Sequence, residues 1–320
     1  MPRRPPQLVP LALDGVSTYA LTKRKSKVSV RDFATPGESA GSISRFIDRL
    51  PRLLAAQDLR GVIRAVTQAH RRGRAVVVGM GAHLIKVGLN PVLIDLIDRG
   101  VITALAMNGA AVIHDFELAL AGKTSEDVEQ QLATGAFGMA RETGLYINEA
   151  IRQGLEHGSG IGRSVGRWLL EHPAPYRRHS ILATAARRGI PVTVHVAIGT
   201  DIIHMHPAVS GAALGEGSHL DFRLLAAVVA GLEGGVYLNI GSAVILPEVF
   251  LKALTLARNL GHRVERFTTV NLDFINHYRP LMNVVRRPTQ KGGRGYNLIG
   301  HHEIMVPLLA AGIVESITRG

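Results

Sequence analysis

The chain has 320 residues, of which 46% are hydrophobic and 19% charged, and its formal net charge is +12. Such a length and composition are typical of a globular protein with a large apolar core. The chain contains no cysteine, which excludes disulfides, thiolate metal sites and a cysteine nucleophile. No apolar run reaches the roughly 18–20 residues of a membrane span and no signal-peptide pattern is present, so we expect a soluble, cytoplasmic protein without a membrane partner.

The positive charge raises the question of a nucleic-acid partner. The basic residues occur in short groups such as Arg71-Arg72 and Arg187-Arg188. There is no long basic tail, and no basic strand carries the aromatic residues that stack on bases. The pattern favours a solvated basic surface, or attraction to an acidic protein acceptor, over nucleic-acid binding.

The first residues are Pro-rich and basic and have no helical period, which predicts an N-terminal arm over residues 1–40. This arm is expected to lie on the body of the protein or on a neighbouring subunit. Residues 41–320 contain no convincing linker and are predicted to form a single α/β domain. Apolar residues that recur at spacings of three and four predict helices over 42–56 and 58–72.

Further along, short apolar runs are each followed by small residues and then a helical pattern. The predicted strands are 75–78, 101–106, 190–197, 236–240 and 264–270. Continuous apolar runs are typical of parallel strands that are covered on both faces. The repeated order of strand, small-residue turn and helix predicts a doubly wound, mostly parallel, Rossmann-like sheet.

Other segments interrupt this order. Residues 123–172 carry no strand pattern and are predicted to be a helical insertion. Asn90 is predicted to cap one helix, and Ser218, with Asp221 three residues later, to cap another. Residues 288–296, rich in Gly and Arg, are predicted to form a flexible segment.

In a parallel open sheet, ligands bind outside the carboxyl ends of the strands. The candidate loops are Gly79–Gly88, Asn108–Asp115, Gly199–His206, Gly241–Glu248, Asn271–His277 and Gly300–Glu303. The segment 234–252 shows the arrangement most clearly, because its turn of small residues would bring the positive end of a helix to a ligand. None of the loops matches G-x-G-x-x-G, which argues against an ordinary Rossmann fingerprint but not against a nucleotide.

Half of the fourteen histidines fall in these loops: His83, His114, His204, His206, His277, His301 and His302. A nitrogen and oxygen metal site could be assembled from these histidines and nearby carboxylates: His204, His206, His301, His302, Glu303, Asp201 and Asp115. The alternative is a set of hydrogen-bonded or acid–base histidines without a metal. Lysine is scarce, and Lys86 and Lys291 are the candidates for an imine-forming nucleophile, with a solvated side chain as the alternative for each.

The order of elements over residues 70–312 resembles that of deoxyhypusine synthase. The segments Val101–Leu120, Ile190–Asp201 and Val236–Leu260 carry most of the likeness. The turn Gly241-Ser242-Ala243 matches the triple-glycine turn of that family, and Ala82-His83 stands where the family has Ser-Asn. The last helix opens with His301-His302-Glu303 where the family has Asp-Ala-Ser, and both continue to Pro-Leu-Leu.

The resemblance implies a homotetrameric transferase that binds NAD across a subunit interface. The family oxidises the polyamine spermidine, passes an aminobutyl group to a lysine as an imine, and hands it to a lysine of a translation factor or, in relatives, to a free diamine. By position, the resemblance implies these cofactor contacts: Ala82, His83, Asn108, Gly109, Ala110, Asp115, Asp201, Gly241, Ser242, Ala243, His301, His302 and Glu303. It implies Lys291 as the rough counterpart of the catalytic lysine, with acid–base or substrate-orienting roles for His114, Asp201 and Glu248.

Several departures from the family concern the active site. Lys291 lacks the family's Trp-Gly-Lys motif, and residues 275–280 replace its Asp-rich loop. Pro247 stands where the family has a histidine, and Arg279 and Arg286 are a poor match for a cationic polyamine. We therefore expect an NAD-dependent transferase acting on an amine, with a diverged active site. The alternatives are histidine-based or metal-assisted chemistry on a non-polyamine substrate, and a non-catalytic nucleotide-binding protein.

Overall fold

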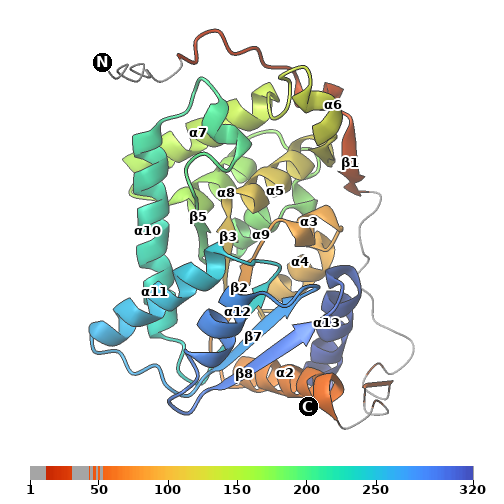
Figure 1. Ribbon diagram of the computed structural model, residues 1–320, viewed down its shortest axis with the longest axis vertical. Coiled ribbons are helices and arrows are strands. Elements are labelled where there is room, and N and C mark those ends of the chain that lie inside the picture. Colours follow the sequence, from red (N-terminus) through yellow and green to blue (C-terminus); the bar gives the residue numbers. More distant parts are fainter. Residues whose placement is uncertain (1–11, 31–42, 44–45, 48–49, 51–52, 320) are drawn as a thin grey trace, which may run out of the picture.

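The computed structural model describes residues 12–30, 43, 46–47, 50 and 53–319. Much of the predicted arm and most of the predicted helix 42–56 lie outside these residues. A six-stranded parallel sheet forms the centre of the protein, with helices on both of its faces (Figure 1). No helix among the described residues is long and apolar enough to cross a membrane.

The sheet has the order β5-β3-β2-β6-β7-β8. Its strands are β2 (Val76–Met80), β3 (Ala104–Asn108), β5 (Val192–His195), β6 (Val236–Ile240), β7 (Thr268–Asp273) and β8 (Arg294–Ile299). The chain runs outward from β2 to β5, returns to place β6 beside β2, and runs outward again to β8. This is the doubly wound Rossmann topology, and it confirms the predicted fold class. The strand order reverses between β2 and β6.

Alternate side chains of the strands supply two cores. Val76 and Val78 belong to one core, whereas Val77 belongs to the other. The larger core packs against α2 (Leu54–Arg71), α4 (Asn90–Asp98), α5 (Gly109–Ala121), α7 (Arg141–Glu156), α8 (Ile161–Glu171), α9 (Ile181–Arg188) and α13 (His302–Thr318). The smaller packs against α10 (Gly211–Ala230), α11 (Ile245–Asn259) and the π-helical turn η5 (Leu281–Arg286), which follows α12 (Tyr278–Pro280). Burial on both faces explains why these strands read as continuous apolar runs.

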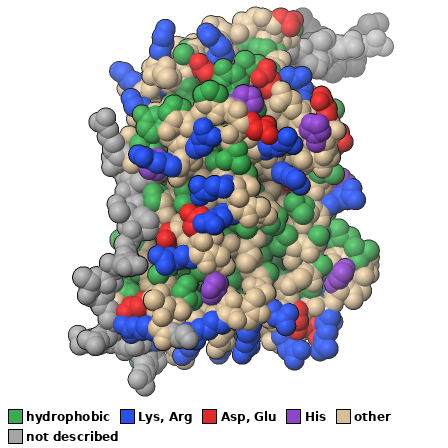
Figure 2. Space-filling model, turned by 180° about the vertical axis from the view of Figure 1, so that it is seen from behind, with side chains coloured by type: hydrophobic (Ala, Val, Ile, Leu, Met, Phe, Trp, Pro, Cys, Tyr) green, Lys and Arg blue, Asp and Glu red, His purple; other side chains and the backbone are tan. Residues whose placement is uncertain are grey.

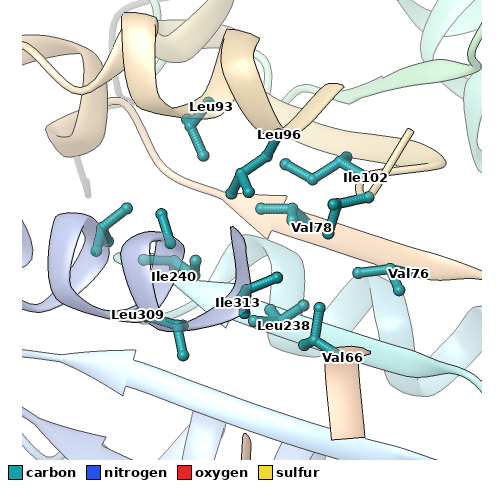
Figure 3. A pocket seen from close by; sticks show the side chains of 13 residues that line it. Val66, Val76, Val78, Leu93, Leu96, Ile102, Leu238, Ile240, Leu309 and Ile313 are labelled. Carbon is teal, nitrogen blue, oxygen red and sulfur yellow. The ribbon is translucent and has the colours of Figure 1, made fainter. Parts of the chain in front are cut away.

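A small cavity of about 30 Å³ lies inside the larger core (Figure 3). It is enclosed by Val78, Leu238 and Ile240 from the sheet and by side chains of α2, α4 and α13, among them Leu309 and Ile313. All of its lining side chains are apolar, so we expect it to hold no water. This cavity is a packing defect of the core and offers no polar group to a ligand.

The N-terminal segment is attached to the body by a second, two-stranded sheet. β1 (Ser26–Ser29) pairs antiparallel with β4 (Lys123–Glu126), and η1 (Leu21–Lys23) precedes it. The prediction that residues 123–172 contain no strand was therefore wrong at β4. The partner of β4 is distant in the sequence, and β4 itself, with one residue of each of four polar types, has no apolar run.

Two predicted helix caps were also wrong. Asn90 lies inside α4, and its amide donates to the Asp115 carboxylate and to a backbone carbonyl. The cap of α10 is Ser210, whose hydroxyl accepts the amide of Ala213. Ser218 lies in the interior of α10, where its hydroxyl bonds backbone groups next to β5. Serine and asparagine bond backbone groups in many settings, so their presence alone does not locate a helix start.

Part of the segment predicted to be flexible, 288–296, forms the beginning of β8. Tyr296 and Leu298 are buried, whereas Arg294 and Ile299 are exposed. β8 is an edge strand with a mixed burial pattern, which is why its sequence lacks the apolar run of the central strands. The rest of the predicted segment is a turn between η5 and β8.

Seen from behind, Lys and Arg side chains are spread over the surface with acidic side chains between them (Figure 2).

Candidate functional site

The turns that follow β2 and β6 touch at the point where the strand order reverses. The amide of Gly81 donates to the carbonyl oxygen of Ile240 over 3.1 Å. A Cβ atom at position 81 would overlap the carbonyl oxygen of Gly241. Gly241 itself has a φ of +64°, in the left-handed region that favours glycine. The close approach of the two turns therefore depends on glycine at both positions.

Three helices begin at this edge of the sheet: α3 (His83–Lys86) after β2, α5 after β3, and α11 after β6. The Asn108 side chain caps α5 by accepting the amide of Ala111 over 3.0 Å. The Ser242 hydroxyl similarly accepts the amide of Leu246 in the first turn of α11 (3.2 Å). The remaining N-terminal amides and the positive ends of helices attract anionic groups such as phosphates.

The carboxyl edge of the sheet has some, but not all, of the features that bind a dinucleotide. The amides at the starts of α5 and α11 suit a pyrophosphate. The first turn reads Gly79-Met-Gly81-Ala-His-Leu84, with a buried leucine in place of the third glycine of the usual fingerprint. At the end of β3, where a carboxylate commonly binds a ribose, the chain has Asn108. The features that suit a dinucleotide are thus mostly backbone amides. Two side-chain positions of the usual fingerprint, the third glycine and the ribose-binding carboxylate, are occupied by other residues.

His302 is completely buried beside the turn at Gly241. Its Nε2 lies 3.2 Å from the carbonyl oxygen of Leu272, which can only accept, so Nε2 carries the hydrogen. Its Nδ1 is then an acceptor, and it has no partner among the described residues. Burial lowers the pKa of His302, which keeps the ring neutral. The His83 ring packs edge-on against the His302 ring, with 5.2 Å between the ring centroids.

A cavity of about 200 Å³, lined by both polar and apolar side chains, lies next to this edge, between α3, α5, β4 and the loop after β5. Its lining includes the charged and polar residues Arg24, Lys86, His114, Glu117, Ser125, Glu126, Thr200 and Asp201. Ala110, in the first turn of α5, also contributes. The cavity therefore joins residues from the N-terminal segment to residues of the Rossmann-like body.

Asp201 lies between the cavity and the start of α5, with its carboxyl group against Gly109. Burial raises its pKa to about 6, although a hydrogen bond from Thr200 opposes the shift. A carboxyl group with such a pKa can exchange a proton near neutral pH. His204 packs beside it, and the His204 Nδ1 accepts the amides of Gly199 (3.1 Å) and Asp201 (3.3 Å).

A buried ion-pair network forms the far wall of the cavity. Arg24 makes a two-point contact with the carboxylate of Glu117, with 2.6 Å between Nη1 and Oε1. A second carboxylate, Glu126, lies 3.7 Å from Arg24 and accepts the Tyr19 hydroxyl over 2.7 Å. Burial disfavours the charge on Arg24, but Glu117 more than offsets this and raises the pKa of the guanidinium.

The sequence did not reveal this network. Arg24 lies in the predicted arm, and Glu117 and Glu126 were not singled out. One available sign was Glu117 itself, a charged residue among the apolar side chains of 116–121. A buried charge needs a partner, but the sequence does not say that the partner comes from the N-terminal segment.

The structure brings many of the predicted residues together at the carboxyl edge. Those at or beside the turns are Ala82, His83, Asn108, Gly109, Ala110, Gly241, Ser242, Ala243, His301, His302 and Glu303. His301 and Glu303 are exposed and lie 3.7 Å apart, whereas His302 is buried behind them. His114 and Asp201 line the cavity.

Lys291 does not join them. It lies in the turn before β8, where the adjoining Gly293 packs on the carbonyl groups of Glu265 and Phe267. These carbonyls precede β7, so Lys291 is at the amino ends of the parallel strands, on the opposite edge of the sheet. Within a single protomer, Lys291 therefore does not share the carboxyl edge with the other predicted site residues.

Asp115 is also misplaced for a cofactor contact. It is completely buried in α5 and caps α9 by accepting the Ser180 hydroxyl (2.5 Å) and the amides of Ile181 (2.8 Å) and Leu182 (3.0 Å). Burial raises its pKa to about 6, while these bonds oppose the shift. These contacts show that Asp115 joins α5 to the start of α9, away from the turns at the carboxyl edge.

Glu248 lies in the first turn of α11, but basic neighbours occupy its carboxylate. Lys252 pairs with it, Arg279 lies 3.3 Å away, and the Asn283 amide donates to it over 2.8 Å. The hydrogen bond from Lys252 is the main cause that lowers the pKa of Glu248. A carboxylate held in this way is a weak proton acceptor.

The weak metal candidates are not assembled into a ligand set. His206 Nδ1 accepts the amide of Ala208 (3.1 Å), and His204 Nδ1 is occupied by the two amides described above. Within the described part of the chain, no group of three or more histidine, aspartate or glutamate side chains is placed to hold a metal ion.

No family model and no curated protein matches this sequence. The fold is similar to that of ArgZ, an arginine dihydrolase from the ornithine–ammonia cycle in cyanobacteria, with a TM-score of 0.50 and 16% identity over 82% of this chain and 33% of that one. AgrE, solved with ornithine and NAD+, gives a TM-score of 0.49 and 16% identity over 84% of this chain and 35% of AgrE. A proposed deoxyhypusine synthase from Entamoeba histolytica gives 0.47 and 11% over 81% and 88%. This chain spans about a third of the length of ArgZ, and at such identities the likeness shows a shared fold alone.

Proposed function

We propose that this protein binds NAD at the carboxyl edge of its sheet and uses it to oxidise a small amine held in the adjoining cavity. The observation that carries the proposal is the meeting of the turns after β2 and β6 at Gly81 and Gly241. Open α/β sheets bind their ligands at such a reversal of strand order. The amides at the starts of α5 and α11 would hold the pyrophosphate, and Ala82, His83 and Asn108 would flank it.

NAD, when bound there, would accept a hydride from the carbon that bears the amine. The protein's own task is to hold that amine and to take up its proton. The helix termini and the buried His302 shape the cofactor side of the site, while Asp201 and His114 face the cavity.

The charge of the cavity supports an amine as the substrate. Three carboxyl groups, from Glu117, Glu126 and Asp201, line the cavity with two cations, the guanidinium of Arg24 and the exposed ammonium of Lys86. The cavity therefore carries excess negative charge in a protein whose net charge is +12. A cationic group fits such a site better than an anion does.

We further propose that the amine is processed by transfer, as the sequence resemblance implies, with an aminobutyl-type group passing through an imine to a lysine or amine acceptor. Such a step requires a lysine on this edge. Lys86 lines the cavity at the end of α3, whereas Lys291 is on the opposite edge. Lys86 is therefore the residue whose adduct the transfer proposal predicts.

The experiment combines NADH formation with borohydride trapping. The protein is incubated with NAD and a panel of diamines and polyamines, reduced with borohydride, and mapped by peptide mass spectrometry. We expect NADH to form and an adduct on Lys86 in the wild type and in Lys291→Arg, but not in Lys86→Arg. NADH without any lysine adduct would reject transfer and retain amine oxidation. NAD binding without NADH for every amine would overturn the enzyme proposal in favour of a nucleotide-binding protein.

A further inference from the structure

A line of hydrogen bonds connects a buried carboxylate to a histidine at the cavity. The His114 side chain, on α5, is 18% exposed and lines the cavity. Its Nδ1 lies 2.6 Å from the hydroxyl oxygen of Thr124 on β4. That hydroxyl lies 2.5 Å from Oε2 of Glu117, one turn further along α5. The three side chains thus form a chain from Glu117 through Thr124 to His114.

The direction of each bond follows from the partners. Glu117 accepts two bonds from Arg24 and one from the Thr143 hydroxyl (3.0 Å), so it is held as a carboxylate that only accepts. Thr124 has one hydrogen, and it donates that hydrogen to Glu117. Thr124 must therefore accept from His114, so the His114 Nδ1 carries the hydrogen and Nε2 has a free lone pair.

We propose that Glu117, acting through Thr124, holds His114 as a proton acceptor whose Nε2 serves the cavity. Glu117 and Thr124 are positioning residues, because they act through His114. The identity of the proton donor rests on the proposed function: Nε2 would take a proton from the substrate ammonium, and NAD, when bound, would supply the acceptor for the hydride of the adjacent carbon, which would leave the substrate as an iminium ion. The proton remains on His114 as an imidazolium, which Glu117 stabilises through Thr124.

The electrostatics keep the His114 ring neutral in the resting protein. Burial lowers the pKa of His114 to about 4; Glu117 raises it, and Lys86 and Arg24 lower it. Glu126 from β4 and Asp201 from the loop after β5 line the same cavity. The resting ring is therefore neutral at pH 7, as a proton acceptor must be.

β4 departs from regular strand geometry at Ser125. Ser125 has a φ of +63°, a left-handed conformation that is strained for non-glycine residues. Successive residues of a regular strand point to opposite faces. Here three successive residues, Thr124, Ser125 and Glu126, are all buried. Strain of this kind is typical of functional sites, and it accompanies the residue that connects His114 to Glu117.

The test compares Thr124→Val, which has nearly the same shape but no hydroxyl, with Thr124→Ser, which keeps the hydroxyl. The full-length proteins are labelled with 15N in their histidines, and the ring nitrogens of His114 are assigned by the loss of signal in His114→Gln. We expect the Nδ1–H form in the wild type and in Thr124→Ser. In Thr124→Val we expect this form to give way to the Nε2–H form, because Nδ1 has lost its acceptor.

An Nε2–H form in the wild type would overturn the proposal, and this result needs no variant to fold. An unchanged His114 spectrum in Thr124→Val would overturn it as well. The spectra require neither NAD nor an amine, so failure of NAD binding and failure of the hydrogen-bond chain are separate outcomes. Where turnover is measurable, Thr124→Val should lower kcat about 10–100-fold with unchanged NAD affinity, and Thr124→Ser should restore it.

Discussion

Gly81 and Gly241 approach so closely that a side chain on Gly81 would enter the space of the Gly241 carbonyl oxygen. The contact joins the two strands between which the strand order reverses. It therefore defines the floor of the proposed cofactor site and makes that floor sensitive to a single methyl group.

We expect Gly81→Ala to lower the free energy of unfolding by about 1–3 kcal/mol, because the added methyl group overpacks the two turns. Gly215→Ala is the control, since Gly215 lies in α10 and a Cβ there would meet nothing within 4 Å. The control should be neutral or stabilised by about 0.5–1 kcal/mol. Urea denaturation measures both, and equal effects would contradict the close approach.

The pair of Arg24 and Glu117 is expected to stabilise the attachment of the N-terminal segment. Arg24→Met leaves Glu117 and Glu126 buried without a cation, which should cost about 3–5 kcal/mol. Arg167→Met breaks an exposed pair with Glu171 and should cost about 0–1 kcal/mol. Thermal or urea unfolding compares the two. A loss for Arg24→Met as small as that of Arg167→Met would mean that the buried network contributes little.

Asp221 should make stability depend on pH. Its Oδ2 accepts the amides of Gly162 (3.0 Å) and Val194 (2.8 Å), while Oδ1 has no partner among the described residues. Burial raises the pKa of Asp221 to about 7 from its ordinary value of 3.8. The stability gained from this proton is complete below pH about 4, declines as the pH rises, and is lost above about 7.

Asp221→Asn removes that titration while keeping an oxygen acceptor. The free energy of unfolding of Asp221→Asn minus that of the wild type should therefore rise from pH about 4 to 7, by on the order of 1–4 kcal/mol, and then level off. Urea titrations across this range provide the measurement. A difference that stays constant with pH would refute the raised pKa.

The apolar cavity of about 30 Å³ offers a test of packing. Val306 lines it from α13, and Val306→Ile should fill part of it and stabilise the protein by about 0.5–1 kcal/mol. Val306→Ala enlarges the space and should cost about 1–3 kcal/mol. Melting temperatures of the two variants should move in opposite directions. Destabilisation by the isoleucine would show that the space cannot take a methyl group.

Large apolar side chains are exposed around the carboxyl ends of β6, β7 and β8: Val244, Phe274, Ile275, Tyr278, Ile299 and Ile304. Exposed apolar patches mark protein interfaces, and we propose that a second copy of this chain covers this one. Light scattering should find a homo-oligomer, and Phe274→Glu should shift it toward monomer. Leu132→Glu, at an exposed position on α6 (Val128–Leu132), is the control. A monomeric wild type would reject the proposal.

The sequence was informative where local pattern decides the structure. β6 has the predicted bounds because its apolar run begins after Gly235 and ends at Gly241. The turns at Gly81, Asn108 and Gly241 were predicted from their small residues, and they do lie together at one edge.

Other features depend on contacts between distant parts of the chain. The pairing of β1 with β4 leaves no local pattern in either strand, and the position of Glu117 among apolar residues does not identify Arg24 as its partner. Lys291 lies in the turn between η5 and β8, and its sequence position did not show at which end of the parallel strands this turn lies. Asp115 was a carboxylate near a glycine-bearing turn, but the four groups that donate to it come from α4 and the start of α9.

The most direct test of NAD binding at the carboxyl edge is hydrogen–deuterium exchange of the full-length protein with and without NAD. This measurement reports both whether NAD binds and which segments it contacts. NAD should slow exchange in the three segments that follow β2, β3 and β6, namely 81–86, 108–112 and 241–246. Exchange around Lys291, on the opposite edge, should not change. Protection at that edge, or no protection at saturating NAD, would contradict a cofactor site where Gly81 meets Gly241.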